Sequence, residues 1–194
     1  MAILAVAAAY LIRIGDEIEQ AIATLLGGQA DRAADVAASY REQFHSRRQG
    51  GVLEPLYPGA RAAIDSLHAR DDVLLGIATG KAMRGVRHMM DTHDLNGRFV
   101  TYQTADTSPS KPHPDMVLRA MAETGAEPER TLMIGDTGFD MAMAKAAGAH
   151  ALGVTWGYHD HSRLADQGAD RIIHSFGDLD RALLEILKID KETI

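Results

Sequence analysis

Leu132-Met133-Ile134-Gly135-Asp136-Thr137-Gly138-Phe139-Asp140 is the stretch that decides the fold. Its apolar run followed by Gly-Asp predicts a buried strand that delivers Asp136 to the edge of a sheet, and the following turn brings Asp140 back toward it. Two carboxylates held together offer the hard oxygen ligands that Mg²⁺ prefers. A second interpretation is structural: Asp136 caps the next helix, and Asp140 is a first-turn acid favoured by the helix dipole.

Strands and helices alternate after a Pro- and Gly-containing linker at residues 54–59. Apolar runs typical of strands covered on both faces alternate with amphipathic helical segments. This pattern predicts the α/β class, with a three-layer, Rossmann-like parallel sheet between helices. The predicted strands are 2–8, 73–78, 99–103, 131–135, 151–155 and 171–174, and the predicted helices are 60–70, 81–93, 114–124, 138–147 and a last one capped by Asp178.

A helical insertion is predicted near the N-terminus. Residues 16–27 and 30–48 show helical spacing of apolar side chains, with no strand between them and a Gly-Gly pair near the end of each. We therefore expect an α/β core made of residues 1–12 and 56–194, and a separate, partial helical unit at residues 13–55.

Composition limits the possible partners. The 194 residues suffice for one core and a small lobe, and the net charge of −7 argues against a nucleic acid or an anionic membrane surface. The absence of cysteine excludes disulfides and Cys-ligated zinc, and it fits the cytoplasm, where we expect the protein. No apolar run reaches the roughly 18 residues that a membrane span needs, so no membrane partner is expected.

Two further segments carry side chains suited to phosphate. Thr79-Gly80 follows a predicted strand, where a hydroxyl and backbone N–H groups can grip phosphate oxygens, although a simple helix N-cap is the other interpretation. Lys111 lies in a Pro-bounded loop, where it is either a solvated surface lysine or a cation for a phosphoryl group. Ligands of parallel sheets bind at the carboxyl ends of strands, so we expect Thr79, Lys111 and the Asp136/Asp140 pair to converge.

The segment His159-Asp160-His161 suggests a metal cluster at first sight. It lacks partners at ligand spacing, so we interpret it as a solvated loop. The helical methionines are interpreted as core filler; they are Met83, Met89, Met90, Met116, Met121, Met141 and Met143.

The order of these motifs resembles the haloacid dehalogenase superfamily of hydrolases. The motifs are an apolar strand with Thr79-Gly80, then Lys111-Pro112, then an apolar strand with Gly-Asp-x-x-x-Asp. The wider sequence is similar to the phosphoglycolate phosphatase branch, in the segments Tyr57-Pro58-Gly59, Ser110-Lys111-Pro112-His113-Pro114-Asp115, Ile134-Gly135-Asp136-Thr137 and Ala146-Ala147-Gly148-Ala149. That branch has a small helical cap after its first strand, and residues 13–55 fit the later part of a truncated cap.

The resemblance implies a Mg²⁺-dependent phosphohydrolase that acts through a phospho-aspartate on a small phosphorylated metabolite, as a monomer or homodimer. By position, Thr79 and Gly80 would hold the phosphoryl oxygens, and Lys111 would stabilise the charge shared by nucleophile and phosphate. Asp136 would ligate Mg²⁺, and Asp140 would support or join that coordination. Thr79, Lys111 and Asp136 are thus the expected catalytic residues.

The sequence departs from the family at its first motif, Asp-x-Asp-Gly-Thr, whose first Asp attacks phosphorus. Here the first carboxylate is Asp16, and Val or Ala stands where the two Asp residues belong. Loss of a nucleophile costs on the order of 10⁶ in rate. We therefore expect a phosphomonoester hydrolase with impaired turnover: either a shortened or altered form of a working phosphatase, or a relative that keeps the phosphate site alone.

Two other functions remain as hypotheses. The first is a non-catalytic phosphate-binding or interaction protein on the same fold. The second is a phosphoacceptor receiver domain, which also combines Asp, Thr and Lys on a parallel sheet. A receiver domain has its acidic residues first and its lysine last, whereas here Thr79 and Lys111 precede Asp136. The motif order therefore argues against a receiver domain.

Overall fold

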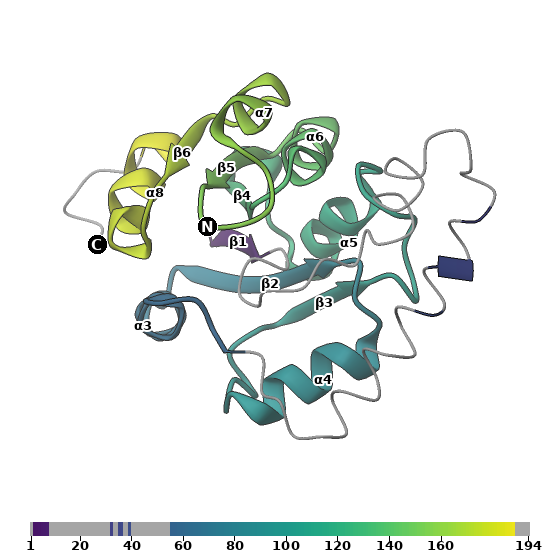
Figure 1. Ribbon diagram of the computed structural model, residues 1–194. Helices are drawn as coiled ribbons and strands as arrows, with labels where there is room; N and C mark the ends of the chain where they lie inside the picture. Colours follow the sequence, from purple (N-terminus) through teal and green to yellow (C-terminus); the bar gives the residue numbers. More distant parts are fainter. Residues whose placement is uncertain (1, 8–31, 33–34, 37–38, 40–54, 189–194) are drawn as a thin grey trace. The chain divides into compact units, whose positions relative to one another are not determined.

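A six-stranded, all-parallel sheet is the framework of this computed structural model, which describes residues 2–7, 32, 35–36, 39 and 55–188 (Figure 1). The strand order is β3-β2-β1-β4-β5-β6. The strands are β1 (Ile3–Ala7), β2 (Val73–Thr79), β3 (Thr101–Thr104), β4 (Thr131–Gly135), β5 (His150–Val154) and β6 (Arg171–Ile173). The helices are α3 (Ala60–His68), α4 (Met83–Thr92), α5 (Asp115–Thr124), α6 (Gly138–Ala146), α7 (His161–Asp166) and α8 (Leu179–Leu187).

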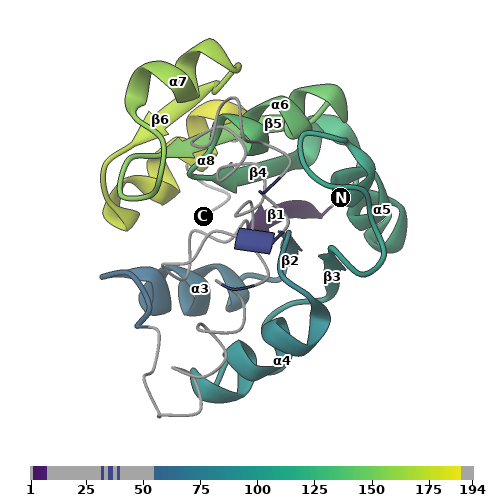
Figure 2. The same ribbon diagram turned by 45° about the vertical axis from the view of Figure 1, so that its right-hand side comes forward.

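Helices cover both faces of the sheet, as Figures 1 and 2 show. Helices α5 and α6 pack on one face, and α3 and α8 pack on the other. This division follows from the right-handed crossovers that join parallel strands, because the chain leaves β1 toward β3 in one direction and returns through β4 toward β6 in the other. The predicted three-layer α/β fold is confirmed.

The core lies between these layers. Leu4 of β1 and both Leu132 and Met133 of β4 are completely buried, and each such side chain contributes about 1.5–3 kcal/mol of burial free energy. Met116, Met141 and Met143 are also fully buried, so these methionines fill the core as predicted.

The strand order reverses beside β1, and this reversal positions the site. Strand β1 pairs with β2 on one side and with β4 on the other, and Ala7 stands opposite both Ile77 and Ile134. Two residues further along the neighbouring strands come Thr79 and Asp136. Parallel α/β sheets bind their ligands at the carboxyl ends of the strands, at such a switch point.

Three local predictions need correction. Helix α7 occupies residues 161–166, where no helix was predicted. Strand β3 begins at Thr101 instead of residue 99. Asp178 does precede the last helix, but its carboxylate accepts hydrogen bonds from Ser175 Oγ and the Arg181 guanidinium, and it accepts none from a backbone N–H at the start of α8.

The chain divides into two compact units, residues 1–13 with 56–194 and residues 14–55. In the second unit Asp35, Val36 and Ser39 are helical. The predicted helix 16–27 and the rest of the helix 30–48 lie outside the described residues, so a partial cap at residues 13–55 stays a prediction. None of the helices in the described part of the chain has the length and apolar character that a bilayer crossing requires.

Candidate active site

Asp136 follows β4 directly and is buried, with 4% of its surface exposed. The N–H of Tyr158 donates to Asp136 Oδ2 at 3.0 Å, and the N–H of His159 donates to the Asp136 carbonyl oxygen at 3.1 Å. Burial and the nearby charge of Asp140 raise the pKa of Asp136 to about 6, although the Tyr158 hydrogen bond and the Lys111 charge act the other way. A second positive charge at this position would therefore be favourable.

Asp140 lies in the first turn of α6 and is 1% exposed. Lys111 Nζ donates to its Oδ1 at 2.8 Å, while the N–H and Oγ1 of Thr137 donate to its Oδ2 at 3.0 and 2.8 Å. Thr137 is the N-cap of α6 and forms a capping box with Asp140. The helix cap is thus Thr137, so the interpretation of Asp136 as the cap is wrong, while Asp140 does stand in the first turn.

Lys111 is buried with Asp140, in the loop between β3 and α5. Its side chain is 7% exposed, and the peptide bond to Pro112 is cis. A buried ion pair is tolerated only when hydrogen bonds satisfy both partners, and here Thr137 completes the shell of the carboxylate. The interpretation of Lys111 as a solvated surface lysine is therefore wrong.

Thr79 ends β2 and is 3% exposed. Its Oγ1 accepts a hydrogen bond from the N–H of Lys81 at 3.1 Å. Helix α4 begins only at Met83, with Ala82 at the N-cap position, so Thr79 does not cap this helix. The Met83 N–H donates instead to Asp106 Oδ2, at 2.7 Å.

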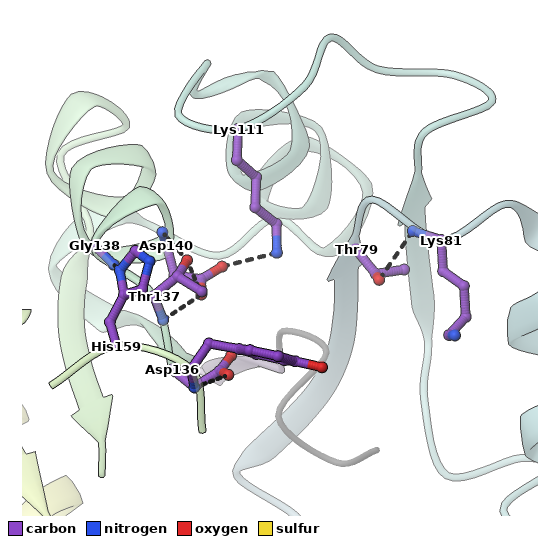
Figure 3. Close-up of polar contacts among 9 residues, drawn as sticks. Thr79, Lys81, Lys111, Asp136, Thr137, Gly138, Asp140 and His159 are labelled. Atoms are coloured by element: carbon purple, nitrogen blue, oxygen red, sulfur yellow. Dashed lines mark hydrogen bonds and ion pairs between the residues drawn. The ribbon is translucent and has the colours of Figure 1, made fainter. Parts of the chain in front are cut away.

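The four predicted side chains meet at one edge of the sheet, as Figure 3 shows. Thr79 and Asp136 stand on either side of the line of β1, about 10 Å apart by strand spacing. Lys111 points from above into the space between Asp140 and Thr79. Gly80 continues the chain from Thr79 toward α4. A hydroxyl, an ammonium group and two carboxylates are thereby gathered around the end of β1.

The loop Trp156–His159 is a part of the site that sequence reasoning missed. A Cβ atom at Gly157 would lie 2.1 Å from Asp136 Oδ2, so only glycine lets this loop approach the carboxylate. His159 is partly buried and its Nδ1 accepts from the N–H of Gly138 at 2.8 Å, so a solvated loop is wrong for this residue. Burial, with help from the Arg163 charge, lowers the pKa of His159. Asp160 accepts from the N–H of Arg163 and caps α7.

The donor chemistry around Asp136 fits Mg²⁺. A buried carboxylate with a raised pKa gains from a nearby cation, and Mg²⁺ is commonly bound by one or two carboxylates, water and the oxygens of a phosphate. The oxygens of Asp140 are engaged by Lys111 and Thr137, which leaves Asp136 as the better direct ligand. Within residues 55–188 and the few others described, no three His, Asp or Glu side chains group as a metal site by themselves.

The fold and the site define the class of protein. It is an α/β protein in which side chains suited to binding phosphate lie at the carboxyl ends of parallel strands, at the switch point of the sheet. The chain belongs to the haloacid dehalogenase-like hydrolase family, whose model matches residues 8–154. The resemblance noted in the sequence is thereby confirmed.

Named relatives agree with this family. The chain is 32% identical over 158 residues to a probable phosphatase, IndB, of Dickeya dadantii, covering 81% of this chain and 66% of the relative. It is 34% identical over 157 residues to a phosphoglycolate phosphatase of Salmonella paratyphi A, covering 79% of this chain and 62% of the relative. The chain thus spans just under two thirds of these curated relatives.

Solved structures share the fold. A predicted phosphatase from Clostridium acetobutylicum superposes with a TM-score of 0.78 at 18% sequence identity, and the match covers 95% of this chain and all of that one. At this identity the similarity concerns the fold alone.

Proposed function

We propose that this protein is a Mg²⁺-dependent phosphomonoester hydrolase similar to phosphoglycolate phosphatases, with a small phosphorylated metabolite as substrate and with slow turnover. Its place would be the cytoplasm, as a monomer or homodimer, and residues 13–55 would form a partial helical cap. The family, the named relatives and the site geometry support the reaction class.

Each side chain has a role in this proposal. Thr79 Oγ1 and the backbone around Gly80 bind and orient phosphoryl oxygens. Lys111 stabilises the developing negative charge, and Asp140 fixes the position of the Lys111 ammonium through their 2.8 Å ion pair. Asp136 holds Mg²⁺, which when bound supplies charge neutralisation at the phosphoryl group.

One observation carries the proposal: the buried Lys111–Asp140 pair lies beside the buried Asp136, at the end of the central strand. Burying three ionisable groups costs stability, and such groups gather where chemistry needs them. A purely structural role would be served at lower cost by apolar side chains of similar size.

Slow turnover follows from the end of β1. The strand itself, Ile3–Ala7, holds no carboxylate, and by sequence the two positions after it are Ala8 and Ala9. The family reaction needs a nucleophile at this place, and the groups that remain only bind and neutralise. The same observation favours the second candidate, a phosphate-binding protein without turnover.

The deciding experiment measures inorganic phosphate binding and p-nitrophenyl phosphate hydrolysis, each with and without Mg²⁺. We expect Mg²⁺-dependent phosphate binding that Asp136→Asn weakens, and hydrolysis far below ordinary enzyme rates of about 1–10³ s⁻¹. Asp180→Asn, the same change on the exposed side of α8, is the matched control. Absence of any Mg²⁺-dependent phosphate binding would overturn the proposal. Measurable turnover would favour the slow hydrolase, and phosphate binding without turnover would favour the second candidate.

A further inference from the structure

The loop after β5 holds Asp136 by its backbone. Consecutive N–H groups, those of Tyr158 and His159, donate to the carboxylate and the carbonyl oxygen of Asp136 at 3.0 and 3.1 Å. Gly157 permits this approach, because a methyl group there would overlap the Asp136 side chain. The orientation of the Asp136 carboxylate therefore depends on where residues 157–159 lie.

His159 fixes that loop to the helix that follows Asp136. Its Nδ1 accepts from the N–H of Gly138, the first residue of α6, at 2.8 Å (Figure 3). An acceptor at Nδ1 places the ring proton on Nε2. The ring also packs against Phe139, with centroids 5.8 Å apart, and Arg163 covers the same phenyl ring from 5.9 Å.

The two contacts close a loop of interactions around the site. Gly138 follows Asp136 by two residues along the chain, and His159 follows Tyr158 by one. Thus the His159 side chain connects the two segments next to the Asp136 carboxylate: the start of α6 and the loop that donates the Tyr158 N–H. The start of α6 also carries the Thr137–Asp140 capping box. The hydrogen bond between His159 and Gly138 therefore also restrains the helix start that positions Asp140 for its ion pair with Lys111.

We propose that His159 is a positioning residue: its Nδ1–Gly138 hydrogen bond sets the Tyr158 N–H against the Asp136 carboxylate and thereby orients that carboxylate for the metal and phosphate of the proposed function, on which this inference rests. Side chains that orient a metal ligand typically change metal affinity 10- to 100-fold when they are removed.

Two variants separate this role from simple packing. His159→Asn presents an amide oxygen close to the position of Nδ1 and can keep the Gly138 bond, whereas His159→Leu keeps apolar volume and removes the acceptor. His161→Leu is the matched control, since His161 is exposed and stands two residues further on. His159→Ala, which removes the acceptor without adding apolar bulk, replaces His159→Leu if that variant does not fold.

The readouts are the amide NMR shift of Gly138, the hydrogen-exchange rate of the Tyr158 amide, and Mg²⁺ affinity. In His159→Leu we expect a shifted Gly138 amide, faster Tyr158 exchange and about 10-fold weaker Mg²⁺ binding. His159→Asn and His161→Leu should both resemble the unmodified protein.

Two results would overturn the inference: unchanged Tyr158 exchange in His159→Leu, or a His159→Asn variant no better than His159→Leu. The exchange measurement needs neither metal nor phosphate. It therefore tests the role of His159 even if phosphate binding fails and the proposed function is wrong.

Discussion

Asp136 illustrates how one residue can link stability to function. The fold places its carboxylate in a buried position with a second carboxylate nearby, and this raises the free energy of its charged form. A bound cation would reverse this cost. The same buried charge that is unfavourable in the folded chain would then favour binding of the cation.

The raised pKa of Asp136 predicts a pH-dependent stability. Between pH 3.8 and about 6 the folded chain holds a proton that the unfolded chain has released, so this contribution is full below about pH 4 and is lost as the pH rises through 6. The difference corresponds to roughly 3 kcal/mol. We expect Asp136→Asn to remove this part of the pH dependence in urea unfolding between pH 4.5 and 7.5. Parallel curves for the variant and the unmodified chain would contradict it; Asp180→Asn is the control.

Lys111 predicts a large stability change. Lys111→Gln removes the charge that compensates the buried Asp140, and breaking one side of a buried pair costs about 3–5 kcal/mol. Urea unfolding at pH 7.5 measures the loss, and exposed Lys188→Gln should change stability by less than about 0.5 kcal/mol. Equal stability of the two variants would mean that the ion pair is not a determinant of the fold.

At the scale of elements, α4 shows a cap supplied from a distance. The first N–H of this helix, that of Met83, donates to Asp106, which lies beyond the end of β3. We expect Asp106→Ala to lower the free energy of unfolding by about 1 kcal/mol, as for other helix caps. Thermal or urea unfolding checks this against Asp71→Ala, an exposed aspartate in the turn before β2. A loss no larger than that of Asp71→Ala would show that the bond contributes little.

Strand β1 allows a test by gain of function. Its register places Ala7 opposite Ile134, two residues before Asp136, and Ala8 and Ala9 follow Ala7 in the sequence. If a missing carboxylate limits turnover, Ala9→Asp should raise Mg²⁺-dependent hydrolysis of p-nitrophenyl phosphate, and Ala8→Asp tests the neighbouring position. Ala122→Asp, on the exposed side of α5, adds the same charge elsewhere. No gain in either folded variant would show that a carboxylate at this strand end is not sufficient.

The elements differ in how far sequence could predict them. Strand β4 was predicted with its correct bounds, because Thr131–Gly135 is buried throughout and Gly-Asp marks its end. Helix α7 was missed, because it has only six residues and one buried side chain, Leu164, so no helical period could show. The bond from His159 to Gly138 joins residues 21 positions apart, and no local pattern indicates such a contact.

Thr79 and Asp136 were found because each stands at a strand end, where fold class alone determines proximity. Lys111 and Asp140 do not adjoin a strand end; the Pro-bounded loop and the spacing of the two carboxylates indicated them. The hydrogen bonds from the Tyr158 and His159 N–H groups to Asp136 had no such signal in the sequence. Gly157, which permits them, looks like an ordinary loop glycine until its neighbour in space is known.

At the scale of the whole molecule, the net charge of the chain and the cations of the proposed site have opposite effects on phosphate binding. The net charge of −7 repels a phosphate, so the anion should bind only where a local cation compensates. We expect inorganic phosphate to raise the free energy of unfolding at pH 7.5 when Mg²⁺ is present, by about 2.7 kcal/mol at 100 times the dissociation constant. Equal stabilisation of Asp136→Asn, measured by thermal unfolding, would contradict a site at Asp136.

The central place of β1 also governs how the chain acquires its structure. This strand leaves the ribosome before both of its neighbours, and Leu4 must wait until Thr131 of β4 has been synthesised before it can pair on that side. Contacts between such distant segments make folding slow, and unpaired apolar strands attract other chains meanwhile. Molecular chaperones that bind nascent chains should therefore raise the yield of soluble, folded protein for this chain.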